Sequence, residues 1–483
     1  MKKLTKKQWT EILFYSFILI IWVVWAYILP LNEGPDEHMR AQIVEFIIKY
    51  GKLPTGFQPE ILDSPWGFTY GFRPILPQML EALFVWIGLI FTKDAFSLLF
   101  LARMVSVLSG IVFIGYVRAI SHKMFSSQVS QWIFTVLVVC LPQASFMFTY
   151  LNCDSMVLMA SAMIVYYLLV GMEDRFSTRT CILLAFSLSI CILSYYNAYG
   201  FLITSLLVFA GAYFQRSRSG DKCWKEFWTK GFLILGIVLL LSGWWFVRNY
   251  FLYDGDIFGL QAQNECSEIH AMDFLKPSNR DTYQNQGYSM GYMLFHTRWI
   301  VAVIRSFIGM LGSYKYKLFW WMYAGYGVLF LAGGTGILVE AFSRFIRWIR
   351  SAERKGPDFT RVSLHLGLLV AILVPNFLNL WYSYASSYQP QGRYSMPMLL
   401  PFMYYMARGI AFWACKLGHA LAERGQKWLR GIGYGVCVWM AVVLLLCVTH
   451  IMWPVYKDVE DKSVVVTYSI EELYGEDWEE KVY

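Results

Sequence analysis

The sequence predicts an all-α polytopic membrane protein with about 11 transmembrane helices and two long outer loops that carry interfacial helices. Of its 483 residues, 57% are hydrophobic and 15% are charged, which is far from the balance of a soluble domain. Apolar runs of about 18 to 25 residues recur along the whole chain, and each is long enough to cross roughly 30 Å of hydrocarbon as a helix.

The basic residues predict the orientation of these spans. They cluster beside the apolar runs, in residues 2–7, 118–123, 175–179, 216–230, 344–361 and 416–430. With every cluster in the cytoplasm, each loop follows the positive-inside rule. We therefore expect a multi-pass protein of the cell membrane with a cytoplasmic N-terminus and an extracytoplasmic C-terminus. The net charge of +8 is explained by this sorting and does not indicate a nucleic-acid partner.

The predicted spans cover residues 12–30, 96–118, 131–150, 154–172, 180–196, 198–214, 230–250, 318–342, 362–382, 395–414 and 432–453. The first is a retained span, because no small-residue cleavage pattern follows it. Two more apolar runs, 74–91 and 292–311, are predicted to lie along the outer surface, since counting either as a span would move basic clusters outside. The second run also carries His296, Arg298 and Arg305, which are costly in mid-bilayer.

This topology divides the chain into a transmembrane domain, residues 1–455, and an acidic extracytoplasmic tail, residues 456–483. Outer loop one covers residues 31–95, and outer loop two covers residues 251–317. Long loops held on a rigid scaffold are where functional sites tend to lie. In the eighth span, the glycines of AGYGVLFLAGGTG favour close helix packing.

Outer loop one begins with a predicted surface helix from Asp36 to Tyr50, because Pro35 suits the first helical turn and Gly51 suits its end. Asp36 and Glu37 at its start are explained either by the helix dipole or by catalysis. A carboxylate at a membrane surface can take a proton from an attacking hydroxyl, which is general-base chemistry. Arg73, at the opening of the second surface helix, either snorkels to the interface or recognises a phosphate.

Several motifs occur in a particular order and on one side of the membrane. They are PDEH (35–38), KYGKLP (49–54), FRPILPQ (72–78) and SGWWFVRN (242–249), and together they resemble the glycosyltransferase-C (GT-C) superfamily of polyprenyl-phosphate-sugar-dependent membrane glycosyltransferases. Three further stretches, YLNCDS (150–155), FLYDGDIFG (251–259) and QPQGRYSMPMLLP (389–401), are similar to a bacterial membrane-protein family catalogued as a domain of unknown function, DUF2142. The resemblance covers about residues 10–455.

The resemblance implies a reaction on the outer leaflet. A sugar would leave a polyprenyl-phosphate carrier and join a hydroxyl of a cell-surface glycan or lipid-linked acceptor, with inversion at the anomeric carbon. The acidic position of the first outer loop corresponds to Asp36 as base, and Glu37 would orient Asp36 or the acceptor. The basic position of the second surface helix corresponds to Arg73, which would hold the carrier phosphate together with Arg248 and Arg393.

A possible second acidic or acceptor site comprises His38, Asn152, Asp154, Gln391 and Tyr394. Some relatives place a second acidic residue at the position of Asp154, with or without a metal, so a divalent metal stays open and no cofactor is certain. The alternative for Asn152 and Asp154 is helix capping.

Three other kinds of function fit a similar fold. A transporter or flippase of lipid-linked glycans would place ionisable residues inside several spans, and only Arg103 and Arg408 stand out there. A ligase or polymerase of lipid-linked glycans would lose activity on substitution of Asp36 if its base lies there, whereas a non-catalytic scaffold would not.

Overall fold

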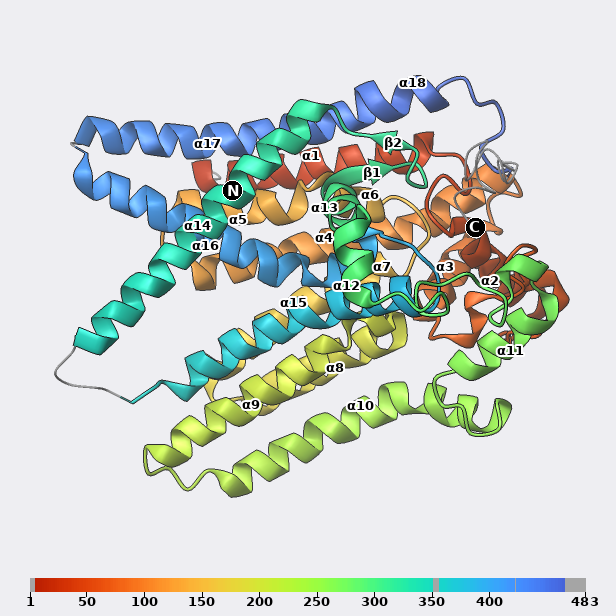
Figure 1. Ribbon diagram of the computed structural model, residues 1–483, viewed down its shortest axis with the longest axis horizontal. Helices are drawn as coiled ribbons and strands as arrows, with labels where there is room; N and C mark the ends of the chain where they lie inside the picture. The colour runs from red at the N-terminus through yellow and green to blue at the C-terminus, as the bar shows by residue number, and fades with distance from the viewer. Residues whose placement is uncertain (1–4, 351–355, 422, 465–483) are drawn as a thin grey trace.

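The computed structural model describes residues 5–350, 356–421 and 423–464, and almost all of them are helical or lie in short connections (Figure 1). The acidic tail predicted from residue 456 therefore lies mostly outside the described residues. The helices of the membrane domain are α1 (Lys6–Ile28), α4 (Ala95–Met124), α5 (Gln128–Val139), α6 (Pro142–Met147), α7 (Asp154–Asp174), α8 (Thr178–Ser194), α9 (Gly200–Arg218), α10 (Trp224–Leu252), α14 (Trp320–Arg350), α15 (Phe359–Ala385), α16 (Leu399–Ala420), α17 (Glu423–Leu446) and α18 (Trp453–Tyr456). The 3₁₀ helices η3 (Tyr196–Ala198) and η5 (Gly392–Met398) and the π-helix η6 (Cys447–Met452) connect or extend them.

Helices occupy all eleven predicted spans. Among the described residues, eight helical segments are long and apolar enough to cross a membrane by length and composition. The other three predicted spans correspond to α8, which has 17 residues, to α16, and to α5 with α6, where Pro142 opens a new helix. An all-α polytopic membrane architecture is thus confirmed.

Both outer loops are built mainly of short helices. Outer loop one contains α2 (Glu37–Tyr50), η1 (Pro59–Ile61), η2 (Tyr70–Phe72) and α3 (Leu76–Gly88). Outer loop two contains α11 (Leu260–His270), η4 (Asp273–Leu275), α12 (Met290–His296), α13 (Trp299–Gly309) and the antiparallel pair β1 (Met310–Leu311) and β2 (Tyr316–Lys317). At about 1.5 Å per residue, the 13 residues of α3 and the 11 of α13 are too short for a span.

The expectation of one interfacial helix over residues 292–311 was wrong in detail. The structure has two helices there, α12 and α13, with Thr297 and Arg298 between them. The Thr297 hydroxyl donates a hydrogen bond to the carbonyl oxygen of Met293, and the hydroxyl oxygen of Thr297 accepts one from the Trp299 amide at 3.2 Å. One side chain thus ends the first helix and starts the second.

The two ends of the bundle differ in composition. Figure 1 shows the end of α9 and the start of α10 at one end of the bundle, together with the end of α14 and the start of α17. Helices α2, α3 and α11 lie at the other end. The basic clusters thus share one end and the outer-loop helices share the opposite end, as the positive-inside pattern requires.

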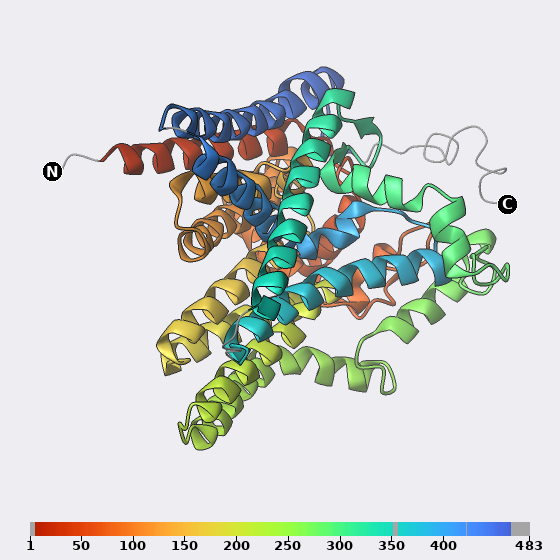
Figure 2. The same cartoon turned by 60° about the vertical axis from the view of Figure 1, so that its left-hand side comes forward.

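Two glycine-rich faces bring α14 and α16 together. A Cβ atom on Gly336 would lie 2.1 Å from the carbonyl oxygen of Gly409, and one on Gly333 would lie 2.7 Å from the Cα of Met406. The close packing predicted from the glycines of the eighth span is therefore confirmed. In both views α10 lies at the edge of the bundle (Figure 2), and only 11% of its most apolar stretch is buried in the protein.

Candidate active site

The tight connection between α1 and α2 places Asp36. Asn32 and Asp36 have φ angles of 70° and 61°, a left-handed conformation that Asn and Asp tolerate better than most residues. Between them, Gly34 packs so closely on Tyr150 that a Cβ would lie 2.2 Å from the ring. Asp36 precedes α2, but its side chain makes no capping hydrogen bond. The carboxylate of Asp36 therefore does not cap α2 by a hydrogen bond.

Glu37, in contrast, is fully engaged and buried. Both of its oxygens accept hydrogen bonds from Arg103, from Nε and Nη2, at 2.8 Å each. The backbone amides of Leu151 and Asn32 donate to the same carboxylate at 3.0 and 3.1 Å. Arg103 also donates to backbone carbonyls at the end of α1, including that of Ala26 at 2.8 Å. Glu37 and Arg103 therefore hold α1, α2, α4 and the start of α7 in one arrangement.

One oxygen of Asp36 is held by two donors from other elements. Arg393 Nη2 donates to Oδ2 at 2.5 Å, and the Tyr70 hydroxyl donates to the same oxygen at 3.1 Å. No described residue donates a hydrogen bond to Oδ1, and the side chain is 29% exposed. Asp36 thus keeps a free carboxylate oxygen beside a fixed cation.

The charges around Asp36 favour its ionised form. Burial by itself raises the pKa of a carboxyl group, but the positive charges of Arg393 and Arg40 and the hydrogen bonds from Arg393 and Tyr70 outweigh it. The pKa of Asp36 is consequently held below its usual value. A proton acceptor must be ionised before reaction, and this environment provides that.

Gln391, Arg393 and Tyr394 form one hydrogen-bonded group. Gln391 Oε1 accepts from Arg393 Nε at 2.9 Å, and the Tyr394 hydroxyl accepts from Arg393 Nη2 at 3.0 Å. Arg393 also donates to the carbonyl oxygen of Pro35 at 3.3 Å. The structure therefore brings three of the predicted site residues, all from the α15–α16 connection, onto the segment that carries Asp36.

Two more guanidinium groups flank Tyr70. Arg40 lies 4.3 Å from the ring centroid of Tyr70, and Arg73 lies 5.4 Å from it. Arg73 Nε donates to Gln263 Oε1 at 2.8 Å, which ties outer loop one to outer loop two. Arg40 is only 7% exposed and makes no hydrogen bond to another described residue. A buried guanidinium without hydrogen-bond partners is expensive unless an anion joins it.

The sequence interpretation missed Arg40. The signal was available, because Arg40 lies four residues after Asp36 in a predicted helix and residues at that spacing share a face. Arg248, which was predicted, has other contacts here. It donates to the carbonyl oxygen of Pro54 and to Asn249 Oδ1, and it lies over the ring of Trp245.

The predicted second acidic site divides into residues with different surroundings. Asn152 Oδ1 accepts from the Ser155 amide at 2.7 Å, so it caps α7. His38 Nε2 lies 2.6 Å from Asp63 Oδ1, and its Nδ1 lies 2.7 Å from Asn32 Oδ1. Asp154 is 6% exposed, and its carboxylate has no hydrogen-bond partner among the described residues.

Asp36 and Asp154 are the two carboxylates that could share a cation. Within the described residues, no group of three or more His, Cys, Asp or Glu side chains could hold a metal ion. Arg393 and Arg40 already act electrostatically on both carboxylates. The two carboxylates alone are too few to hold a metal ion without further ligands from outside the described residues.

Comparison with protein families identifies the chain. The family model described as "Predicted membrane protein (DUF2142)" matches residues 76–402, about two thirds of the sequence. The chain belongs to this family. Arg248, Arg393 and Asp154 lie inside the DUF2142 match, whereas Asp36 and Arg73 precede it. No curated protein matches the sequence.

Solved structures share the architecture of this DUF2142 protein. The archaeal oligosaccharyltransferase AglB from Archaeoglobus fulgidus, in complex with an inhibitory peptide and a dolichol-phosphate, is 12% identical with a TM-score of 0.51, covering 90% of this chain and 56% of that chain. The Archaeoglobus fulgidus oligosaccharyltransferase in complex with Zn and sulfate is 13% identical with a TM-score of 0.51, covering 89% and 52%. ArnT from Cupriavidus metallidurans is 13% identical with a TM-score of 0.40, covering 86% and 81%.

The protein therefore has a GT-C fold, as the motifs implied. It spans just over half the length of the archaeal oligosaccharyltransferases that it matches.

Proposed function

We propose that this protein is a membrane glycosyltransferase. It moves a sugar from a polyprenyl-phosphate carrier to a hydroxyl of a cell-surface glycan or lipid-linked acceptor on the outer leaflet, with inversion. The observation that carries the proposal is the free Oδ1 of Asp36, on a carboxylate whose other oxygen is bound by Arg393 and Tyr70. The GT-C fold and the dolichol-phosphate bound to AglB support the class of donor.

In the proposed reaction the acceptor hydroxyl gives its proton to Asp36 Oδ1 while its oxygen bonds to the anomeric carbon. The bond between that carbon and the carrier phosphate oxygen breaks, and the electron pair leaves with the phosphate. Attack from the face opposite the leaving group inverts the anomeric centre. Arg393 and Tyr70 hold the carboxylate in place, so that its free oxygen faces the acceptor.

The carrier phosphate gains negative charge as it leaves, and fixed cations lower the energy of that state. We assign this role to Arg40 and Arg73, beside Tyr70, together with the predicted Arg393. Arg248, near the end of α10, donates to the carbonyl oxygen of Pro54 and so holds the part of outer loop one that precedes Arg73. Glu37 is a positioning residue, since Arg103 and two backbone amides occupy its carboxylate.

A transporter or flippase finds less support. The ionisable side chains that stood out within the spans are paired, because Arg103 binds Glu37 and Arg408 binds Glu340 at 2.8 and 3.0 Å. Paired charges of this kind stabilise helix contacts and leave no free polar path of their own.

Mass analysis of surface glycans tests the proposal in cells that carry the natural protein or the Asp36→Ala variant. A transferase that adds one sugar predicts glycans shorter by the mass of one residue in the variant. Loss of a whole repeat would favour a ligase or polymerase. Unchanged glycans, with the variant present in the membrane at the natural level, would exclude a catalytic role for Asp36.

A further inference from the structure

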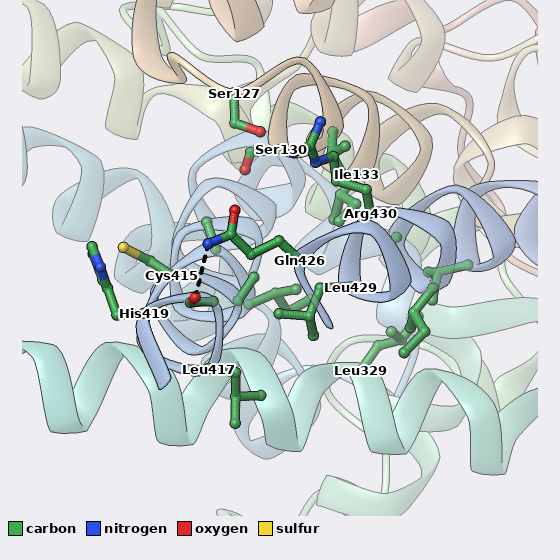
Figure 3. A pocket seen from close by; sticks show the side chains of 18 residues that line it. Ser127, Ser130, Ile133, Leu329, Cys415, Leu417, His419, Gln426, Leu429 and Arg430 are labelled. Carbon is green, nitrogen blue, oxygen red and sulfur yellow. Dashed lines mark hydrogen bonds between the residues drawn. The ribbon is translucent and has the colours of Figure 1, made fainter. Parts of the chain in front are cut away.

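A second feature lies at the end of the bundle opposite Asp36. Helices α5, α14, α16 and α17 enclose a cavity of about 480 Å³ that is open on one side (Figure 3). This volume is within the range of sites that bind small molecules. Its inner part is apolar and is lined by Val129, Ile133, Ile410, Ala411, Leu429 and Val436.

The polar groups of the cavity gather where the helices end. Ser127 precedes α5, His419 lies in the last turn of α16, and Gln426 and Arg430 lie in the first turns of α17. Figure 3 shows the Arg430 side chain extending toward the part of α5 that carries Ser130. The cavity thus has a polar end near the helix termini and an apolar end within the bundle.

Arg430 has no bonding partner among the residues that the structure describes. No hydrogen bond, ion pair or ring contact links its guanidinium to any other described residue, whereas Gln426 Nε2 donates to the carbonyl oxygen of Gly418 at 3.2 Å. The nearby residues Lys416, Arg424 and Lys427 are also basic, and Glu423 is paired with Lys427. Arg430 is exposed, so its guanidinium is free to pair with an anion from outside the protein.

The depth of Arg430 indicates which anion can reach it. The helical segment from Glu423 to Tyr456 has 34 residues, which at about 1.5 Å each exceeds the roughly 30 Å hydrocarbon layer by about 20 Å. If the excess is shared between both ends, about 10 Å projects at each. Arg430 lies seven residues after Glu423, at about that distance, and therefore at the level of the lipid phosphates.

We propose that this cavity binds one anionic phospholipid from the leaflet opposite the Asp36 site. The phosphate pairs with the Arg430 guanidinium, and the hydroxyls of Ser127 and Ser130 lie in the same polar end of the cavity. An acyl chain fills the apolar part between α5, α16 and α17. A free phosphate ion would leave the apolar part of the cavity empty. The bound lipid would brace the contact between α5 and α17 independently of the reaction proposed above.

Native mass spectrometry of the purified full-length protein tests this site, with phosphatidylglycerol and phosphatidylcholine of the same acyl chains as probes. The natural protein should retain one phosphatidylglycerol in preference to phosphatidylcholine. Arg430→Gln should reduce that preference about fivefold, since one basic residue contributes about that much to anionic-lipid binding. Arg430→Lys should keep part of it. Arg424→Gln, which removes a charge from the same helix outside the cavity, is the matched control.

Two results would overturn the proposal. One is equal retention of phosphatidylglycerol by the natural protein and by Arg430→Gln. The other is loss of the preference on addition of inorganic phosphate at unchanged ionic strength, which would indicate an anion site without a lipid. Ala414→Trp, which fills the cavity, should reduce retention of both lipids, and a melting temperature close to that of the natural protein would show that the variant is folded.

Discussion

At the scale of single residues, the two neighbouring acids at the start of α2 have separate environments. Asp36 has one free oxygen, whereas every oxygen of Glu37 is occupied. Adjacent side chains on a helix point in different directions. Of two neighbouring acids, one can therefore face solvent while the other faces the core. The difference predicts different consequences for the two substitutions.

Asp36→Asn should lower transfer by about a hundredfold or more, because the amide keeps the size of the carboxylate but cannot accept the proton. The pKa of Asp36 is held below its usual value, so the base stays ionised through neutral pH, and activity should be lost only at a pH below the ordinary titration range of an aspartate. The rate of sugar transfer from a polyprenyl-phosphate donor, measured against pH, tests both points. Glu45→Gln, an exposed acid on the same helix, is the control, and transfer by Asp36→Asn near the natural rate would contradict the assignment.

Arg40→Gln should weaken binding of the carrier phosphate by about 1.5–3 kcal/mol, the usual contribution of a hydrogen bond to a charged group. Its guanidinium is buried beside Tyr70 and lacks a hydrogen-bond partner among the described residues. Equilibrium binding of a labelled polyprenyl phosphate measures the effect, with Arg73→Gln and Arg393→Gln in parallel. Arg218→Gln, at the opposite end of the bundle, should bind normally. Natural affinity in the Arg40, Arg73 and Arg393 variants alike would remove the proposed phosphate site.

At the scale of elements, the Glu37–Arg103 pair fixes α2 on α4. Glu37→Gln should destabilise the protein by about 3–5 kcal/mol, because it leaves the buried guanidinium without its anion. Replacing both residues by Met should cost less than this single change. Unfolding in detergent measures the difference, and Glu423→Gln provides the control, since its exposed pair with Lys427 contributes at most about 1 kcal/mol. A single variant no less stable than the double one would contradict the role of the pair.

The contact between α14 and α16 gives a second prediction at this scale. Gly336→Ala should lower the melting temperature, because its Cβ would lie 2.1 Å from the carbonyl oxygen of Gly409. Gly334→Ala, two residues earlier on the same helix, should be neutral or stabilising by up to about 1 kcal/mol, since no other atom lies within 4 Å of its Cβ position. Thermal unfolding should therefore show a lower melting temperature for Gly336→Ala and an unchanged or higher one for Gly334→Ala. Equal shifts would mean that α14 packs differently.

At the scale of the whole molecule, the orientation in the membrane can be tested by labelling. In a cysteine-free background, Asn285→Cys in outer loop two should react with a membrane-impermeant maleimide in intact cells. Ser219→Cys, between α9 and α10, should react only after permeabilisation, because its loop belongs to a basic cluster. Labelling of Ser219→Cys from outside would reverse the predicted orientation.

Much of the fold could be predicted from the sequence, because span length and charge sidedness are local properties. The charge pattern excluded the apolar runs 74–91 and 292–311 as spans, and the structure has α3 in the first and the α12–α13 pair in the second. The break at Thr297 was missed, since it depends on one hydroxyl that bonds on both sides. The division of the third predicted span into α5 and α6 was missed in the same way, although Pro142 marks it.

The site was predictable only in part. The sequence placed Asp36 and three arginines in one layer of the membrane, but it could not say which arginine contacts the carboxylate. That pairing joins residues 357 positions apart and depends on how α15 and α16 pack. Tyr70 was missed because its role comes from contacts between two segments, and no motif records such contacts, whereas Arg40 could have been found from its spacing of four residues from Asp36.

The turn before Asp36 also contacts residues that are far away in the sequence and are synthesised much later. Glu33, in the short turn before Asp36, accepts hydrogen bonds from Tyr456 at the end of the last helix and from Lys315 in outer loop two. The backbone amide of Leu31 donates to the carbonyl oxygen of Lys462 at 2.9 Å. In a chain emerging from the ribosome, Asp36 is synthesised long before these partners exist. Under the function proposed above, we therefore expect sugar transfer only after the last helix has been inserted, and none from a chain that ends before Tyr456.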